Sequence, residues 1–258
     1  METKPDKINL KKLDVSPLTR RCITFQIPEQ WKSQYYLYGL SEDKLVPVIE
    51  QHLEKGGIFV DIGANYGFYT VLAADIVGSS GKVIAFEPTP SSLAVLQENC
   101  RSLTNVTIDP RLIYSEEKKN VPFNDFGIMA SPMNSMYSPR TGNKLQATVI
   151  NVDAVSLDSY FTDHVPTMVK IDAEGAEYHV LKGMTRIIED ASPVITLEVG
   201  DFDIEGVPMS KDCIKFLLDK GYNVYQYENN NYQPHKIKEK YSYTNLVFVK
   251  KKNNTQKR

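Results

Sequence analysis

An acidic residue followed by a glycine turn marks the stretch IFVDIGANYGFYTVLAA, residues 58–74. The turn contains Asp61, Gly63, Asn65 and Gly67 and joins an apolar strand pattern to an apolar helix pattern. A dinucleotide site uses G-x-G-x-x-G, because the backbone must approach a pyrophosphate at the helix N-terminus. Asp61 occupies the position of the first glycine, where its charge would repel a pyrophosphate but attract an amino group. The turn therefore favours a ligand with an amino acid moiety.

A second acid lies at the end of the next apolar segment. Glu87 ends VIAFE and follows Gly67 by twenty residues. An acid at this place accepts hydrogen bonds from ribose hydroxyls. A ribose next to an amino acid describes S-adenosylmethionine, so Asp61 and Glu87 together favour this cofactor over a dinucleotide.

Two further carboxylates end later strand patterns. Asp172 ends MVKID and Glu198 lies near the end of PVITLEVG. Ligands of open α/β sheets bind at the carboxyl ends of the strands, where both side chains are expected. If the methyl group of this cofactor goes to a hydroxyl, a base must take the hydroxyl proton or a metal ion must lower its pKa. We expect Asp172 to be the leading base, with Glu198 second; the same pair could hold Mg²⁺.

Other titratable residues have simpler interpretations. Glu174 and Glu177 lie at a predicted helix N-terminus, where capping is the expected role. Lys170, in a predicted central strand, could pair with an acid or orient one. The four histidines, which are His52, His164, His179 and His235, are all poorly placed to act as the base.

The segments that must position these residues alternate between strand and helix patterns. Seven strands are expected, at residues 57–63, 82–88, 105–109, 167–175, 193–200, 222–227 and 244–249. Alternation of this kind predicts a Rossmann-like α/β fold with a mostly parallel sheet and helices on both faces. The last two strands are separated by a polar loop and are expected to form an antiparallel pair in the edge region of the sheet.

The length of 258 residues suits one large domain. We expect an N-terminal extension of uncertain order over residues 1–34, a catalytic domain over 35–250 and a basic tail over 251–258. Residues 121–146 contain three prolines and no period, which predicts a long loop that is either functional or a surface insertion.

The composition limits the partners. Lysine and arginine number 30 against 32 acids, giving a net charge of −2, so no nucleic-acid partner is expected. No apolar run has membrane-spanning length and the first residues are charged, so a cytoplasmic protein without membrane contact is expected. The sequence carries no signal for oligomeric state.

Four segments in order resemble the FkbM family of S-adenosylmethionine-dependent methyltransferases. They are FVDIGANYGFYT, VIAFEP, VKIDAEGAEYHVLKGM and ITLEV, and the resemblance extends over residues 38–249. The third segment is the most specific, because the glycine turn recurs throughout class I methyltransferases. The resemblance implies a seven-stranded sheet with one antiparallel strand, and methyl transfer to a hydroxyl of a sugar or natural-product small molecule.

The resemblance also implies which residues contact the cofactor. In the family, the acid and glycines of the turn and the acid after the second strand lie against it, which corresponds to Asp61, Gly63, Gly67 and Glu87 here. An acid in the helix ahead of the first strand corresponds to Glu42, in LYGLSED, by a looser alignment.

Three alternatives differ from this interpretation. An NAD-dependent oxidoreductase shares the fold class, but Asp61 and the lack of a Tyr-x-x-x-Lys pair argue against it. A methyltransferase acting on nucleic acid or protein is a second alternative, although KIDAEG stands where base-amine methyltransferases have an Asn/Asp-Pro-Pro-aromatic signature. The third is a non-catalytic cofactor-binding protein, against which stands the intact cofactor turn.

Overall fold

The computed structural model describes residues 8–137, 146–201, 204 and 206–250. The basic tail at 251–258 and the first seven residues of the extension lie outside these ranges. Within the described part, no helix is both long enough and apolar enough to cross a membrane.

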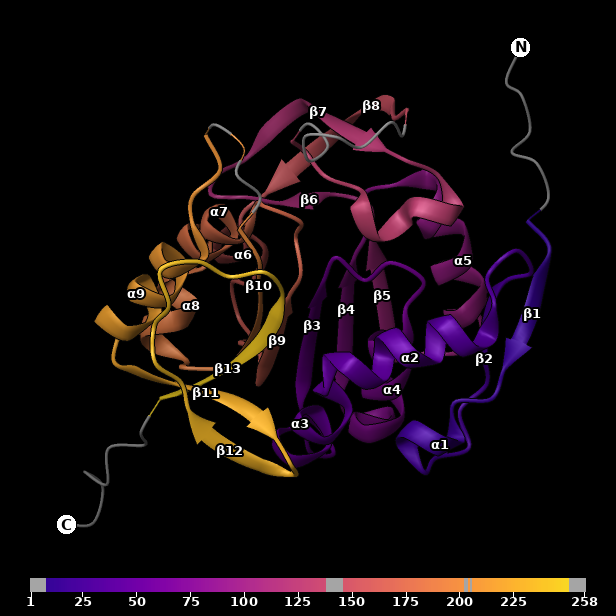
Figure 1. Ribbon diagram of the computed structural model, residues 1–258, viewed down its shortest axis with the longest axis horizontal. Coiled ribbons are helices and arrows are strands. Elements are labelled where there is room, and N and C mark those ends of the chain that lie inside the picture. Colours follow the sequence, from indigo (N-terminus) through magenta and orange to yellow (C-terminus); the bar gives the residue numbers. More distant parts are fainter. Residues whose placement is uncertain (1–7, 138–145, 202–203, 205, 251–258) are drawn as a thin grey trace.

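The main sheet has eight strands in the order β12-β11-β13-β10-β9-β3-β4-β5 (Figure 1). Their bounds are β3 Ile58–Ile62, β4 Lys82–Phe86, β5 Val106–Asp109, β9 Met168–Ile171, β10 Val194–Val199, β11 Tyr222–Glu228, β12 Asn231–Pro234 and β13 Thr244–Lys250. Strands β5, β4, β3, β9 and β10 are parallel, and β13 runs antiparallel between β10 and β11. The predicted Rossmann-like α/β fold is confirmed.

The sheet has one strand more than expected. β12 pairs antiparallel with β11 and takes the outer edge, in a segment that the sequence pattern indicated only as a polar loop. Its side chains are mostly exposed, so it lacks the apolar alternation that would reveal a strand. Asn229 and Asn230, both with positive φ, supply the tight turn between the two strands.

Helices cover both faces of the sheet. One face packs against α3 Leu45–His52, α4 Phe68–Val77 and α5 Pro90–Cys100, and the other against α6 Leu157–Tyr160, α7 Glu177–Lys182, α8 Thr185–Asp190 and α9 Ser210–Asp219. Nine of the ten residues of α4 are buried, as its nearly all-apolar pattern predicts. Two apolar cores, one on each face, therefore hold the sheet rigidly under the site.

The N-terminal segment is ordered and packs against the domain. Its elements are β1 Leu10–Leu13, α1 Ser16–Thr19, β2 Phe25–Pro28 and α2 Ser33–Asp43. β1 and β2 pair antiparallel, and Phe25 and Ile27 are at most 1% exposed within the same core as α4. The Asn99 side chain of α5 accepts from the Gln26 amide and donates to its carbonyl. Residues 8–34 thus complete one face of the molecule.

A small second sheet, along the top of Figure 1, is inserted between β5 and β9. It consists of β6 Leu112–Ile113, β7 Lys118–Asp125 and β8 Thr148–Val155, and η2 Ile128–Met133 follows β7. The expectation of a long loop over 121–146 is wrong for its first part, because 121–125 belong to β7 and 128–133 to η2. Most side chains of β7 are exposed or half-buried, so the strand shows no apolar alternation. Residues 138–145 lie outside the described ranges.

Candidate active site

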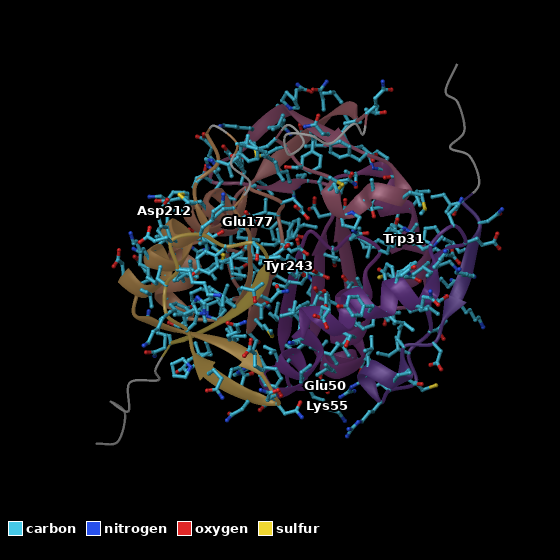
Figure 2. All side chains as sticks on the ribbon, viewed as in Figure 1. Trp31, Glu50, Lys55, Glu177, Asp212 and Tyr243 are labelled. Atoms are coloured by element: carbon cyan, nitrogen blue, oxygen red, sulfur yellow. The ribbon has the colours of Figure 1, made fainter. Side chains whose placement is uncertain are left out.

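A cavity of about 310 Å³ opens at the carboxyl ends of β3, β4, β9 and β10. This size lies within the usual range of ligand pockets. Its wall also includes α2, η2 and the residue before β13. Figure 2 labels Trp31 and Tyr243, two wall residues from distant parts of the sequence. Of the predicted site residues, it is lined by Gly63, Asn65, Glu87, Asp172 and Glu198.

Close backbone packing requires the glycines of the turn. Gly63 has φ 73°, and a Cβ there would lie 1.8 Å from the carbonyl oxygen of Asp172. Gly67 has φ 86° and precedes α4, and a Cβ there would lie 2.4 Å from Leu96 Cδ1. Both positions favour glycine for conformation and for space. Gly67 does not line the cavity itself, so its role is to start α4.

Asp61 is fully buried and does not reach the cavity. Its Oδ2 accepts a hydrogen bond from Thr70 Oγ1 at 2.7 Å, and its Oδ1 lies 3.3 Å from Lys170 Nζ. Asp61 was expected to attract an amino group of the ligand. In the structure, the positive group beside Asp61 is the ammonium of Lys170, which belongs to the protein itself. Sequence pattern alone gave no distance between these two residues, which are cross-strand partners of β3 and β9.

Glu87 is 5% exposed and faces the cavity. One carboxylate oxygen accepts from the Asn65 amide at 2.8 Å, and the other accepts from the amide and hydroxyl of Thr89. Burial raises the pKa of Glu87, and these hydrogen bonds partly oppose that effect. A carboxylate has about four acceptor positions, so the three described donors leave one for a ligand hydroxyl.

The carboxyls of Asp172 and Glu198 lie next to each other, beside Lys170. The two carboxyls are hydrogen-bonded, and Lys170 Nζ lies 3.2 Å from Asp172 Oδ2. Burial raises the pKa of Glu198 well above its usual range, and the negative charge of Asp172 is the second largest cause of this increase. Burial also acts to raise the pKa of Asp172, but Lys170 and Glu198 outweigh it and leave that pKa below normal. These opposite directions favour the ionised form of Asp172 and the protonated form of Glu198.

Lys170 is the cation that organises these acids. Its side chain is 4% exposed, and its Nζ also donates to the carbonyl of Gly63 at 3.2 Å. Burial acts to lower its pKa, but Asp172 and Asp61 more than compensate, so the pKa is raised and the lysine stays charged. Both roles foreseen for Lys170 occur together, since it pairs with one acid and orients another.

The acid that α2 brings to the cavity is Asp43 and not Glu42. Asp43 accepts hydrogen bonds from the hydroxyls of Tyr69, at 2.7 Å, and Tyr243. Burial raises the pKa of Asp43. Glu42 is exposed and lies at a separate, smaller pocket against β11 and β13. The two positions differ by one residue, which on a helix is a rotation of about 100°, and the loose alignment did not resolve it.

Three further titratable residues considered from the sequence are Glu174, Glu177 and His179. Glu177 accepts three hydrogen bonds from the amides of Ala173 and Gly175, which agrees with the capping role expected for it, and burial raises its pKa to about 7. Its neighbour Glu174 lines the cavity. His179 stacks on Tyr114 with ring centroids 4.3 Å apart and lies outside the cavity wall.

Sequence reasoning missed several wall residues. Arg111 makes a two-pronged ion pair with Asp109, with its closest nitrogen 2.7 Å from the carboxylate. Trp31 donates to the carbonyl of Ile128 at 3.2 Å and so ties the N-terminal segment to η2. The spacing of Asp109 and Arg111 after a strand was a readable signal, whereas no motif marked Trp31 or Tyr243 as a residue of the cavity wall.

Comparison with known proteins identifies the family to which the sequence is similar. Residues 61–224 match the family described as the methyltransferase FkbM domain. The hexuronic acid methyltransferase AglP of Haloferax volcanii is 27% identical over 182 residues, which cover 70% of this chain and 71% of that protein.

Two solved structures have similar folds. A methyltransferase FkbM from Methylobacillus flagellatus is 16% identical with a TM-score of 0.48, covering 86% of this chain and 56% of that one. A precorrin-6y C5,15-methyltransferase from Geobacter metallireducens is 15% identical with a TM-score of 0.46, covering 88% of this chain and 94% of that one. The family match spans more than half of the chain, and the protein therefore belongs to the FkbM-domain methyltransferases, enzymes that take their methyl group from S-adenosylmethionine.

Proposed function

We propose that the protein transfers a methyl group from S-adenosylmethionine to a hydroxyl oxygen of a sugar or a similar natural-product small molecule. The observation that carries this proposal is the placement of an ionised carboxylate, Asp172, in the same cavity as the free acceptor position of Glu87. The relative that acts on a hexuronic acid supports a sugar as the acceptor.

The cofactor would lie across the ends of β3 and β4. Its ribose would donate a hydroxyl to the remaining acceptor position of Glu87, beside the backbone of Gly63 and Asn65. Its sulfonium charge, which S-adenosylhomocysteine lacks, suits the carboxylate of Asp172. When bound, the cofactor supplies the electrophilic methyl group.

Asp172 is the proposed general base. When bound, the cofactor would give its methyl group to the acceptor oxygen, with the electrons of the carbon–sulfur bond left on sulfur, and the carboxylate of Asp172 would take the hydroxyl proton. Lys170 holds one oxygen of the Asp172 carboxylate, and the raised pKa of Glu198 favours its protonated form, which would keep the two acids from repelling each other. The products are a methyl ether and neutral S-adenosylhomocysteine.

Magnesium is the alternative activator. Asp172, Glu174 and Glu198 each offer a carboxylate oxygen, and these oxygens lie within 4.8 Å of one another. However, the ammonium group of Lys170 already lies 3.2 Å from Asp172, and the raised pKa of Glu198 opposes the ionised form that a metal would bind. The charge balance therefore favours a metal-free base. Activity that survives excess EDTA supports this mechanism, and activity restored only by Mg²⁺ contradicts it.

Calorimetric titration tests the proposal directly. S-adenosylmethionine and S-adenosylhomocysteine should bind and NAD should not, and Glu87→Ala should weaken binding at least about tenfold, because a hydrogen bond to a charged group is lost. Labelled methyl transfer to a panel of hexoses, hexuronic acids and their methyl glycosides then identifies the acceptor. Transfer only to a nuclease-sensitive or protease-sensitive substrate pool would instead support the macromolecular alternative.

A further inference from the structure

One face of α2 forms part of the cavity wall. Tyr35, Gly39 and Asp43 follow one another at intervals of four residues, so they lie in a row along this helix, and all three line the cavity. The acidic end of the row carries the hydroxyl of Tyr243, and the other end carries the ring of Tyr35. We call Tyr35, Gly39 and Asp43 the α2 row.

The rings at the cavity entrance are exposed. Tyr35 is 60% exposed and Tyr243 is 50% exposed, although both line the cavity. A large apolar side chain that faces both a cavity and solvent marks the entrance of that cavity. The flat face of an aromatic ring packs well against the apolar C–H face of a sugar ring, and the hydroxyls of the sugar stay free for polar partners.

Gly39 has no packing reason to be a glycine. A Cβ built there would meet no described atom within 4 Å, and its φ is not in the positive region that favours glycine. Glycine in a helix interior destabilises the helix relative to almost any other residue. The two other glycines discussed for the site, at the turn, are each closed in by an atom within 2.5 Å of the Cβ position. Gly39 therefore keeps space open in the α2 row at a cost to helix stability.

We propose that the α2 row is the acceptor subsite, where a pyranose ring stacks on Tyr35 and passes over Gly39 to bring a hydroxyl to Asp172. This inference rests on the proposed function and names the class of acceptor and the residues that select it. The side chain of Tyr35 provides the stacking surface, and the missing side chain of Gly39 provides the clearance. Both residues precede the segment that matches the family.

The helix supplies matched controls. Tyr38 lies on α2, is 65% exposed and does not line the cavity. Tyr35→Ala and Tyr38→Ala therefore remove the same exposed ring from the same helix, one inside the subsite and one outside it. Ser41 is likewise exposed on α2 and outside the wall, so Ser41→Leu is the control for Gly39→Leu.

The test measures sugar binding to the protein saturated with S-adenosylhomocysteine. Trp31 is the only tryptophan of the chain and lines the cavity, so its fluorescence reports binding. The probes are the methyl pyranosides of glucose, galactose, mannose and glucuronic acid. At least one should bind to the wild type, about tenfold more weakly to Tyr35→Ala because stacking is lost, and without change to Tyr38→Ala.

Gly39→Leu gives an independent result. It should raise the Tm by about 2–4 °C, since a good helix former replaces glycine, and should abolish sugar binding while leaving the affinity for S-adenosylhomocysteine unchanged. Ser41→Leu should leave sugar binding intact. The inference is overturned if the loaded wild type binds none of the four pyranosides, or if the row variants bind them as their controls do. A wild type that does not bind S-adenosylhomocysteine would instead refute the proposed function.

Discussion

The two ends of the cavity are built in different ways. At the cofactor end, backbone groups of one short stretch and two glycines set the geometry, and Glu87 is held by amides of Asn65 and Thr89. At the acidic end, charged side chains from α2, β9 and β10 hold one another around Lys170. The cofactor end is therefore fixed by local chain conformation, and the acidic end by long-range charge balance.

The variant Asp172→Asn should separate the two ends most clearly, because it should change the rate of methyl transfer and not the binding of the cofactor product. We expect the rate of methyl transfer to fall about 10²–10⁴-fold, the range over which a general base contributes, while the affinity for S-adenosylhomocysteine changes little. Turnover of the acceptor identified by the labelled panel measures the first, and calorimetry the second. A parallel loss of both would mean that the acidic end also holds the cofactor, and the two ends would not be separable.

Removal of the central cation should damage the acidic end through stability. Lys170→Met leaves Asp61 buried without its ion pair, and breaking a buried pair on one side costs about 3–5 kcal/mol. Chemical denaturation measures this loss. The double variant Asp61→Asn/Lys170→Met removes both charges and should recover most of the stability; equal losses in the single and double variants would show that the charge balance is not what Lys170 provides.

At the cofactor end, we expect a substitution to lower stability because the added side chain has too little space. Gly63→Ala places a methyl group against the carbonyl of Asp172, whereas Gly56→Ala has a similar φ of 82° and meets only Ser80 Oγ at 3.7 Å. Both variants bear the positive-φ penalty, so the excess for Gly63→Ala, about 1–3 kcal/mol for an overpacked site, isolates the close approach. Thermal unfolding of the two variants gives this difference, and equal Tm values would contradict it.

The smallest expected effect is on the pH dependence of stability, through the titration of Glu198. Because the pKa of Glu198 is raised in the folded protein, its contribution to stability is full below the unfolded-state pKa of about 4.3 and is lost as the pH rises toward the folded-state value. Glu198→Gln keeps a hydrogen-bond donor without the titration. The free energy of unfolding should therefore decline less steeply with pH in this variant, whereas a slope identical to wild type would mean that Glu198 is not protonated in the fold.

The same contrast explains what the sequence could reveal. Gly63, Asn65 and Glu87 were predicted because their spacing along one strand–turn–helix unit is set by local geometry, and the alternation of strands and helices predicted the sheet for the same reason. Asp43 and Tyr243 are 200 residues apart and meet only in the folded chain. No period or spacing encodes such a contact, so the cavity wall at that end had to be observed.

Exposed strands were invisible for a related reason. β7 and β12 present most of their side chains to solvent and form their ladders through backbone hydrogen bonds. A pattern of apolar residues detects burial and not pairing, which is why both strands were interpreted as loops. The N-terminal hairpin shows the same limit, since its buried residues Phe25 and Ile27 alternate over too short a stretch to predict a strand.

The position of β13 has a consequence for biosynthesis. β13 is the last strand in the described part of the chain, yet it lies between β10 and β11, and Tyr243 immediately before it reaches across to Asp43 of α2. A nascent chain still inside the ribosome exit tunnel cannot supply this strand, so β11 has no partner on that side and the cavity lacks one wall. The site is therefore complete only once β13 has been synthesised and has left the tunnel, and a chain truncated before residue 243 would retain the cofactor turn without a complete active site.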